Sequence, residues 1–175
     1  MRIEYGNLTI RNAGAQDAAQ LAAWWNDGKV MAHAGFPNGL GITPEEIMQK
    51  LAGDDDNMHR RLILECGGRA IGEMNYRNQM DRSAEIGIKI CDFSMQEKGL
   101  GRQYLSMLIG TLFAMGYERI CLDTNLKNIR AQHVYEKLGF EKVRVRENSW
   151  QDQLGAWQSA VDYELTQKNF VNFAK

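Results

Sequence analysis

The order of predicted elements indicates a mixed α/β (α+β) fold rather than a doubly wound parallel sheet. The first observation is a pair of strand-like segments, 61–66 and 69–76, joined by Gly67-Gly68, which is a strong signal for a tight antiparallel hairpin. The second is the order that follows, in which a strand, a helix, a strand, a second helix and further strands alternate along the chain. A hairpin followed by alternating elements is typical of a mixed sheet.

The predicted strands show alternating apolar and polar residues. In the clearest of them, Ala84 to Ile90, the apolar residues would share one face, while Glu85, Gly87 and Lys89 would share the other. The remaining strands are predicted at 8–11, 61–66, 69–76, 119–123, 141–146 and 159–165.

The predicted helices combine helical spacing of apolar residues with recognisable ends. Thr43 and Glu46 can cap each other in a capping box, and Pro44 suits the first helical position. Gly116 and Gly139 follow the two later helices, where a left-handed residue commonly ends a helix. Helices are predicted at 17–26, at 43–51, between 96 and 116, and at 128–138, and the glycine-rich stretch 31–41 is predicted to be a loop.

Length and composition fit a single soluble domain, 1–175, because no repeat, low-complexity tract or linker divides the chain. Lys plus Arg come to 21 and Asp plus Glu to 22, which gives no electrostatic footprint for nucleic acid or an anionic membrane. No apolar run reaches the length of a membrane span, and the N-terminus lacks the apolar core of a signal peptide. Cys66, Cys91 and Cys121 are isolated, so we expect reduced thiols in a cytoplasmic protein and no metal site.

The sharpest chemical feature is the segment Gln96-Glu97-Lys98-Gly99-Leu100-Gly101-Arg102, which lies between a predicted strand and the long helix. Such a loop exposes consecutive backbone N–H groups at a helix N-terminus, where the helix dipole also favours an anion. Its glycines let the backbone approach a phosphate, and its Lys and Arg can add charge-assisted hydrogen bonds. The loop lacks the Lys-Ser/Thr ending of a P-loop and the third glycine of a dinucleotide fingerprint. A tight turn before a helix is an alternative explanation of the glycines.

A second motif follows the next strand. Asn128, Ala131, Tyr135 and Gly139-Phe140 stand at the spacing N-x-x-A-x-x-x-Y-x-x-x-G-F. Together with the Q-x-x-G-x-G loop before it, this motif resembles the cofactor half of the GNAT N-acetyltransferase superfamily over about 84–140. The branch that it resembles most contains ribosomal-protein, polyamine and some aminoglycoside acetyltransferases. The resemblance implies a GNAT-like mixed, mostly antiparallel central sheet of about six or seven strands flanked by about four helices.

The resemblance also implies an activity: direct transfer of an acetyl group from acetyl-CoA to a primary amine in a ternary complex, without a metal. Backbone N–H groups from Glu97 to Arg102 would hold the CoA pyrophosphate, and the strand 87–90 would pair with the pantetheine arm. Asn128 would hydrogen-bond the cofactor, although it is equally suited to cap the helix that follows. The implied cofactor contacts are Ile88, Ile90, Gln96, Glu97, Lys98, Gly99, Leu100, Gly101, Arg102, Asn128, Ala131 and Tyr135.

Two catalytic residues are implied by the resemblance. Tyr135 would protonate the departing CoA thiolate, although its helical spacing also fits a core aromatic. A primary amine with a pKa of about 10 is mostly protonated at neutral pH, so the transfer needs a base as well as a donor to the oxyanion. Glu85 is the candidate base, with Glu73 on the preceding strand as its substitute, and the N–H near Ile88 is the candidate donor. For Glu85 the alternative is an edge carboxylate in a surface ion pair.

The acceptor stays open at this level: a protein N-terminus, a polyamine or an aminoglycoside-like small-molecule amine. Asp54-Asp55-Asp56 would suit a cationic acceptor, but a solvated loop explains these residues better. His133 is expected on a helix surface. Residues in segments that border the acceptor site in related folds are Trp24, Trp25, His33, Phe36 and Trp150. The alternative from another class is a non-catalytic acyl-CoA-binding sensor or interaction module, and we expect a monomer or homodimer with no nucleic-acid or membrane partner.

Overall fold

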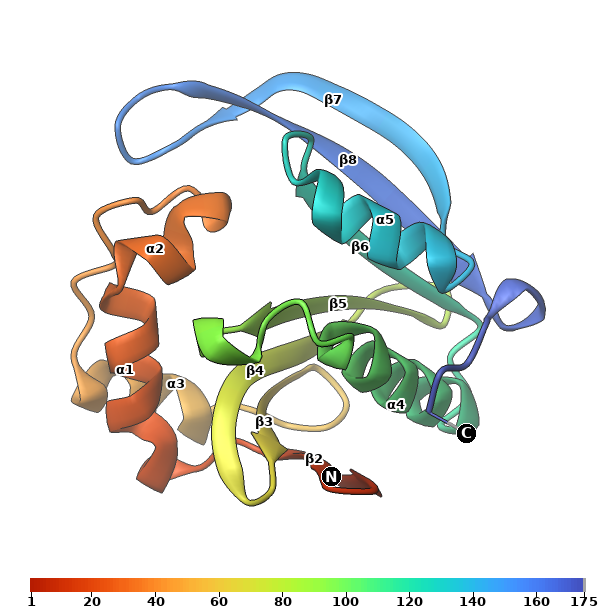
Figure 1. Ribbon diagram of the computed structural model, residues 1–175, viewed down its shortest axis with the longest axis horizontal. Coiled ribbons are helices and arrows are strands. Elements are labelled where there is room, and N and C mark those ends of the chain that lie inside the picture. The colour runs from red at the N-terminus through yellow and green to blue at the C-terminus, as the bar shows by residue number, and fades with distance from the viewer. Residues whose placement is uncertain (175) are drawn as a thin grey trace.

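Eight strands form one sheet in the computed structural model, which describes residues 1–174 (Figure 1). In spatial order they run β1-β2-β3-β4-β5-β6-β8-β7, and every neighbouring pair is antiparallel except β5 and β6. The strands are β1 (Arg2–Tyr5), β2 (Leu8–Asn12), β3 (His59–Cys66), β4 (Arg69–Asn78), β5 (Ser83–Ile90), β6 (Arg119–Asn125), β7 (Glu141–Gln151) and β8 (Trp157–Thr166). This is the predicted mixed, mostly antiparallel fold, with eight strands instead of six or seven.

The additional strand is β1, at a position where no strand is predicted. It pairs with β2 from Tyr5 opposite Leu8 to Arg2 opposite Arg11. The connection between them is the two-residue turn Gly6-Asn7, and Gly6 has a left-handed φ of +59°. The strand is therefore ordered by a hairpin, as β3 and β4 are.

Five α-helices accompany the sheet, and four of them lie where apolar spacing predicts them. The helices are α1 (Ala18–Asn26), α2 (Gly28–Met31), α3 (Pro44–Ala52), α4 (Leu100–Ala114) and α5 (Ile129–Lys137). The predicted loop 31–41 is partly wrong, because α2 and a 3₁₀ turn at Ala32–Ala34 precede the irregular part. Asp27 starts α2 by accepting a hydrogen bond from the Lys29 N–H. A single helical turn is too short to give an apolar period, so the sequence pattern misses it.

The predicted end signals have the geometry that they require. The Thr43 N–H donates to Glu46 Oε2 at 2.8 Å, and the Glu46 N–H donates to Thr43 Oγ1 at 3.2 Å, which completes the capping box at the start of α3. Gly67 and Gly68 have φ of +59° and +77°, as a tight hairpin between β3 and β4 demands. These local agreements fix where the elements begin and end.

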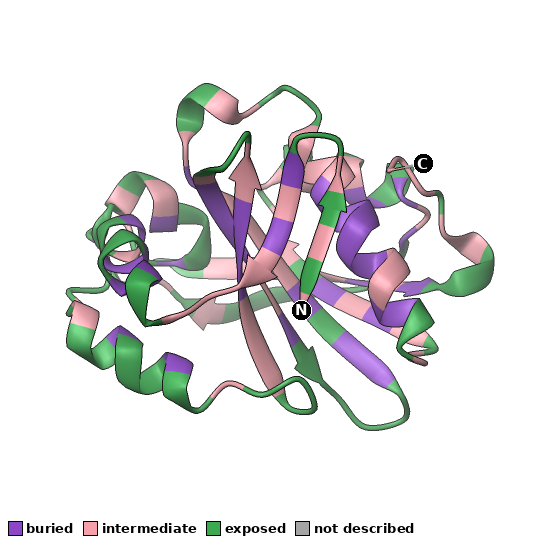
Figure 2. Cartoon of the chain, turned by 90° about the horizontal axis from the view of Figure 1, so that it is seen from below, coloured by how far each residue is buried: buried purple, intermediate pink, exposed green. Residues whose placement is uncertain are grey.

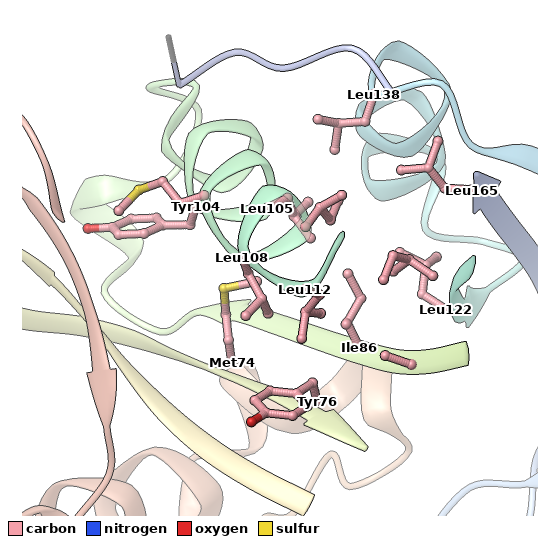
Figure 3. Close-up of a cluster of buried hydrophobic side chains, with 14 of the residues drawn as sticks. Met74, Tyr76, Ile86, Tyr104, Leu105, Leu108, Leu112, Leu122, Leu138 and Leu165 are labelled. Atoms are coloured by element: carbon pink, nitrogen blue, oxygen red, sulfur yellow. The ribbon is translucent and has the colours of Figure 1, made fainter. Parts of the chain in front are cut away.

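Helices cover both faces of the sheet (Figures 1 and 2). On one face, α4 contributes a buried stripe that includes Tyr104, Leu105 and Leu108 and packs against Met74 and other strand residues (Figure 3). On the other face, buried side chains of α1 and α3 pack against the sheet in a second, smaller hydrophobic cluster. The buried members of that cluster are Ala18, Leu21, Ala22, Trp24, Ile47, Leu51, Ile63 and Cys91. Alternation along β3 divides the two cores, because successive side chains point to opposite faces.

The parallel pair β5 and β6 is short, and this positions the candidate site. The two strands pair only from Ser83 opposite Arg119 to Glu85 opposite Cys121. Beyond that point β5 continues to Ile90 and stays paired with β4 alone, while β6 continues along β8. The sheet therefore opens between β5 and β6.

Cys66, Cys91 and Cys121 are free thiols, and burial raises the pKa of Cys91 and of Cys121. Across residues 1–174, no cluster of three or more His, Cys, Asp or Glu side chains is placed to hold a metal ion. Over the same residues, no helix has the length and apolarity that a bilayer crossing requires.

Candidate functional site

A cavity of about 1110 Å³ lies where β5 and β6 diverge. One wall is formed by 86–90 of β5, the loop 93–99 and the first turn of α4. The opposite wall is formed by 122–125 of β6 and by α5. A third side comes from the α2 region through Lys29, Val30, His33 and Ala34, together with Trp150 of β7. All of the predicted cofactor contacts line this cavity except Lys98, so the structure brings the two sequence motifs together.

The 96–102 loop is fixed by the side chain of Gln96. Its Nε2 donates to Ile90 O at 2.8 Å, and its Oε1 accepts from Arg130 Nη2 at 3.0 Å. The loop is thereby tied to β5 on one side of the cavity and to α5 on the other. Gly99 then begins α4 with a left-handed φ of +76° and supplies no side-chain cap. The first N–H groups of α4 are consequently available to a ligand.

Gly101 has no internal reason to be glycine. Its φ is not left-handed, and a Cβ built there would meet no protein atom within 4 Å. Gly101 nevertheless lines the cavity, so a side chain at this position would affect a ligand rather than the fold. Lys98 lies outside the lining and contacts Met95 Sδ at 3.9 Å.

Tyr135 is almost completely buried, with 7% of its surface exposed, and still lines the cavity. Its ring packs edge-on against Phe140 and Tyr163, with centroids 5.9 Å and 5.8 Å apart. Burial and the nearby charge of Asp123 raise the pKa of Tyr135 to about 12. The hydroxyl therefore stays protonated throughout the neutral range. Both descriptions of Tyr135, as a packed aromatic and as a group that faces the cavity, hold in the same structure.

Asn128 caps the N-terminus of α5, which is the role expected for it besides a hydrogen bond to the cofactor. Its Oδ1 accepts from the Ala131 N–H at 3.3 Å, and its Nδ2 lies 3.4 Å from Thr124 Oγ1. These contacts join α5 to the end of β6. Asn128 and Ala131 line the cavity together with His133, which is exposed on the surface of α5.

Glu85 does not belong to the cavity lining. It is exposed, and its Oε2 accepts from Gln79 Nε2 at 2.8 Å. The physical reason is the strand pairing, because Glu85 stands opposite Cys121 in the last pair before β5 and β6 separate. The catalytic role expected for Glu85 stays a prediction, and its place outside the cavity lining does not support it.

Glu73 does not line the cavity either, but its carboxylate contacts Lys89, which does. It stands opposite Lys89 in the β4–β5 pair, and only 5% of its surface is exposed. Its Oε1 accepts from Trp25 Nε1 at 2.9 Å and from Lys89 Nζ at 3.0 Å. Lys89 lines the cavity, so its side chain links the Glu73 carboxylate to the cavity. Lys89 is a site residue that the sequence analysis misses, although its alternation with Gly87 places it on this face.

A rim closes the third side of the cavity, and we define it as residues 28–39 together with the tip of the β7–β8 hairpin, 150–154. Gln153 joins the two parts: its N–H donates to Gly35 O, its Oε1 accepts from the Asn38 N–H, and its Nε2 donates to Gly39 O, at 2.8, 2.9 and 2.9 Å. The ring of Trp150 lies against Gly35, where an added Cβ would approach it to 2.3 Å. No local sequence signal marks Gln153, because its partners lie far away in the chain.

The acidic run at 54–56 is not part of the cavity. Asp54 forms an ion pair with Arg61 that leaves 3% of its side chain exposed, and Asp56 pairs with Arg60 at 2.6 Å. Asp55 Oδ1 accepts hydrogen bonds from the backbone N–H groups of Asn57 and Met58, at 2.7 and 2.9 Å. The expectation of a solvated loop is therefore wrong for Asp54, because its carboxylate is buried in the ion pair with Arg61.

Positive charge predominates around the cavity. The cationic side chains in its lining are Lys29, Lys89, Arg102, Lys127, Arg130 and Lys137. The carboxylates in the lining are Glu97 and Asp123, and each is already paired, with Arg130 at 3.4 Å and Arg146 at 2.6 Å respectively. Such a field favours an anionic ligand.

A family model and several solved structures match the chain. The family model described as an acetyltransferase (GNAT) domain matches residues 7–141. A spermidine N-acetyltransferase from Vibrio cholerae, solved with CoA and spermine, superposes with a TM-score of 0.82 at 24% identity, over 95% of this chain and 99% of that one. A GNAT-family acetyltransferase from Streptococcus pneumoniae gives a TM-score of 0.75 at 26% identity, over 91% of this chain and 99% of that one.

Curated relatives match over shorter segments. The [ribosomal protein bS18]-alanine N-acetyltransferase of Haemophilus ducreyi is 30% identical over 70 residues, which is 40% of this chain and 48% of that protein. In general, the chain spans less than half the length of the curated relatives that it matches.

Proposed function

Because the chain belongs to the GNAT acetyltransferase domain family, we propose that it is an enzyme that transfers an acetyl group from acetyl-CoA to a primary amine. One observation carries the proposal. A single cavity contains an uncapped helix N-terminus, the unpaired edge of β5 and the buried side chain of Tyr135. A phosphate-bearing thioester such as acetyl-CoA needs an anion site for its phosphates, a strand edge for its extended arm and a proton donor for its sulfur, in this order along its length.

The 96–102 loop and the first turn of α4 are proposed to hold the diphosphate of acetyl-CoA. The N–H groups of Leu100, Gly101 and Arg102 carry the positive end of the helix dipole, which favours an anion. Gly101 leaves its backbone uncovered toward the cavity, and the surrounding lysines and arginines reinforce the field. The edge of β5 at 87–90 is proposed to pair with the pantetheine arm through its backbone.

Tyr135 is proposed to act as the general acid. Acetyl-CoA supplies the activated acyl group, and the departing thiolate needs a proton. The Tyr135 hydroxyl is protonated at neutral pH and can therefore donate a proton, although burial, which raises its pKa to about 12, makes it a weaker acid than a free phenol. The two aromatic neighbours of Tyr135 hold its ring in one orientation. The oxyanion is proposed to accept from the backbone N–H near Ile88.

Glu73, rather than Glu85, is proposed to remove the amine proton, directly or through water. Its carboxylate is held by Trp25 and Lys89 on the face of the sheet that meets the rim. Glu85 lies in the paired part of β5, outside the cavity. The amine would therefore enter from the rim side and meet the acetyl group near the point where the strands diverge.

We propose the α-amino group of a polypeptide as the acceptor. Among residues 1–174, both carboxylates that line the cavity are already paired with arginines, so a polyamine or aminoglycoside finds no unpaired carboxylate there to bind its additional positive charges. An α-amino group has a pKa of about 8, compared with about 10 for an alkylamine, so more of it is neutral at pH 7. Curated relatives named for N-terminal acetylation, an N-alpha-acetyltransferase of Dictyostelium discoideum and the bS18-alanine enzyme, are consistent with this choice.

The test is a competition in one tube. The protein is incubated with acetyl-CoA and equal concentrations of peptides with free N-termini, the same peptides with blocked N-termini and internal lysines, spermidine and an aminoglycoside. Mass spectrometry identifies the acetylated product, and a thiol reagent measures CoA release. We expect acetylation of free N-termini and little of the other acceptors. Preferential acetylation of spermidine would reject the acceptor, and CoA binding without any thiol release would reject catalysis in favour of a sensor.

A further inference from the structure

The C-terminal tail, residues 170–174, is held against the two helices that flank the cavity (Figure 1). The Val171 N–H donates to Leu138 O, which belongs to the end of α5, at 3.0 Å. The Phe173 N–H donates to the buried hydroxyl Oγ of Ser106 on α4, also at 3.0 Å. The tail therefore has a defined path across α4, and this path brings Phe173 beside the side chain of Arg102.

Arg102 lies under this tail in an unusual environment. It belongs to the first turn of α4, where the helix dipole disfavours a cation. Within residues 1–174 no carboxylate forms an ion pair with it, and its Nε is buried without a hydrogen-bond partner. A buried donor without an acceptor destabilises a fold. Because Arg102 also lines the cavity, an anion bound there would offset the unfavourable interaction of its charge with the helix dipole.

The ring of Phe173 covers one face of the Arg102 guanidinium, with Cζ 4.1 Å from the ring centroid. A cation over an aromatic face is attracted by the ring quadrupole, and the stack leaves the edges of the planar guanidinium free to donate. A long side chain that is held before binding loses less conformational freedom when the ligand arrives. The stack therefore prepares Arg102 for an anion.

We propose that Phe173 is a positioning residue that holds Arg102 toward a phosphate of the CoA ester, so that this one side chain of the tail contributes to the cofactor site. This inference rests on the proposed function, since it needs CoA in the cavity. The Phe173 ring lies beside the guanidinium and acts through it. Its loss should therefore weaken cofactor binding and leave the chemical step unchanged.

The experiment measures the Kd of CoA by calorimetry in four proteins: wild type, Phe173→Leu, Phe173→Tyr and Val171→Ala. Phe173→Leu should weaken binding roughly five- to thirtyfold, which is the range of a desolvated cation–π contact. Phe173→Tyr keeps an aromatic ring and should restore most of the affinity. Val171→Ala is the matched control, because Val171 is in the same tail, is 47% exposed, and donates to Leu138 O through its backbone N–H, which alanine keeps. Its Kd should equal that of the wild type.

Two further measurements separate positioning from a structural role. Steady-state kinetics should show a raised KM for acetyl-CoA with kcat unchanged in Phe173→Leu, and no change in KM for acetylpantetheine, which has no phosphate. In an Arg102→Gln background, Phe173→Leu should have no further effect on the Kd. Equal weakening of acetylpantetheine, or an unchanged Kd for CoA in Phe173→Leu, would overturn the role of the tail. A wild type that bound no CoA would instead refute the proposed function from which the inference starts.

Discussion

The substitution Gly101→Val tests the 96–102 loop most sharply, because the structure predicts opposite effects on stability and on binding. A Cβ at Gly101 meets no protein atom within 4 Å, and the residue lies in the first turn of α4 with ordinary φ. Valine has a helix propensity about 0.4 kcal/mol better than glycine, so the melting temperature should be unchanged or slightly raised. In the complex, however, the branched side chain would occupy the space that the diphosphate needs.

The size of the binding effect follows from the hydrogen bonds at risk. Each hydrogen bond to a charged group contributes about 1.5–3 kcal/mol, so the loss of one N–H contact should raise the Kd of acetyl-CoA roughly tenfold to 150-fold. Calorimetry gives the Kd, and thermal unfolding without ligand gives the stability.

The matched control is Gly99→Ala. Gly99 has a φ of +76°, so alanine there is strained by about 1–2 kcal/mol and should lower the melting temperature. A normal Kd in Gly101→Val, at normal stability, would refute the assignment of this loop to the diphosphate. An unfolded Gly101→Val would show instead that the space beside Gly101 is filled by the protein itself.

Three further predictions concern other parts of the molecule. Tyr135→Phe should leave the Kd of acetyl-CoA near normal and lower kcat by roughly 10²-fold or more, the effect of a positioned acid; an unchanged kcat in a steady-state assay would leave Tyr135 with a packing role only. Gln153→Ala removes two side-chain hydrogen bonds across the rim and should raise the KM of the acceptor roughly three- to tenfold while the KM of acetyl-CoA stays constant; equal changes in both would contradict a role confined to the rim. Burial alone would raise the pKa of Asp17, but hydrogen bonds from Arg11 and the Gly14 N–H outweigh it and hold the pKa below its usual value. Asp17→Asn should therefore lower the free energy of unfolding by about 2–3 kcal/mol at pH 7. A carboxylate whose pKa is lowered in the folded state stabilises the fold fully only above its unfolded pKa of about 3.9. The difference in unfolding free energy between wild type and Asp17→Asn, measured with urea, should therefore shrink as pH falls below about 4. If the difference in unfolding free energy between the two proteins stayed constant down to pH 2.5, the charge of the Asp17 carboxylate would not be the source of the stabilisation.

Much of the fold could be predicted because its signals are local. The capping box at Thr43 and Glu46 and the hairpin glycines Gly67-Gly68 need only a few neighbouring residues to act, and the structure shows their expected geometry. β1 was within reach of the same reasoning, because Gly6-Asn7 is a two-residue turn between two alternating segments. α2 was not, since a single turn has no measurable apolar period.

The candidate site divides in the same way. The 96–102 loop and the Asn128–Tyr135 motif are short-range patterns, and the structure places them around one cavity. The choice between Glu85 and Glu73 depends on where β5 and β6 stop pairing, which alternation along one strand does not contain. Gln153 is beyond sequence reasoning altogether, because its role arises only when a hairpin tip meets a loop more than a hundred residues away.

A crystal structure of the protein with CoA tests the central claim most directly. We predict that the diphosphate oxygens accept hydrogen bonds from the main-chain N–H groups of Leu100 to Arg102, with the pantetheine arm along 87–90 of β5 and the sulfur near Tyr135. CoA bound at another place, with no ligand atom in contact with this helix start, would contradict the account and remove the basis for assigning Tyr135 and Glu73 their roles.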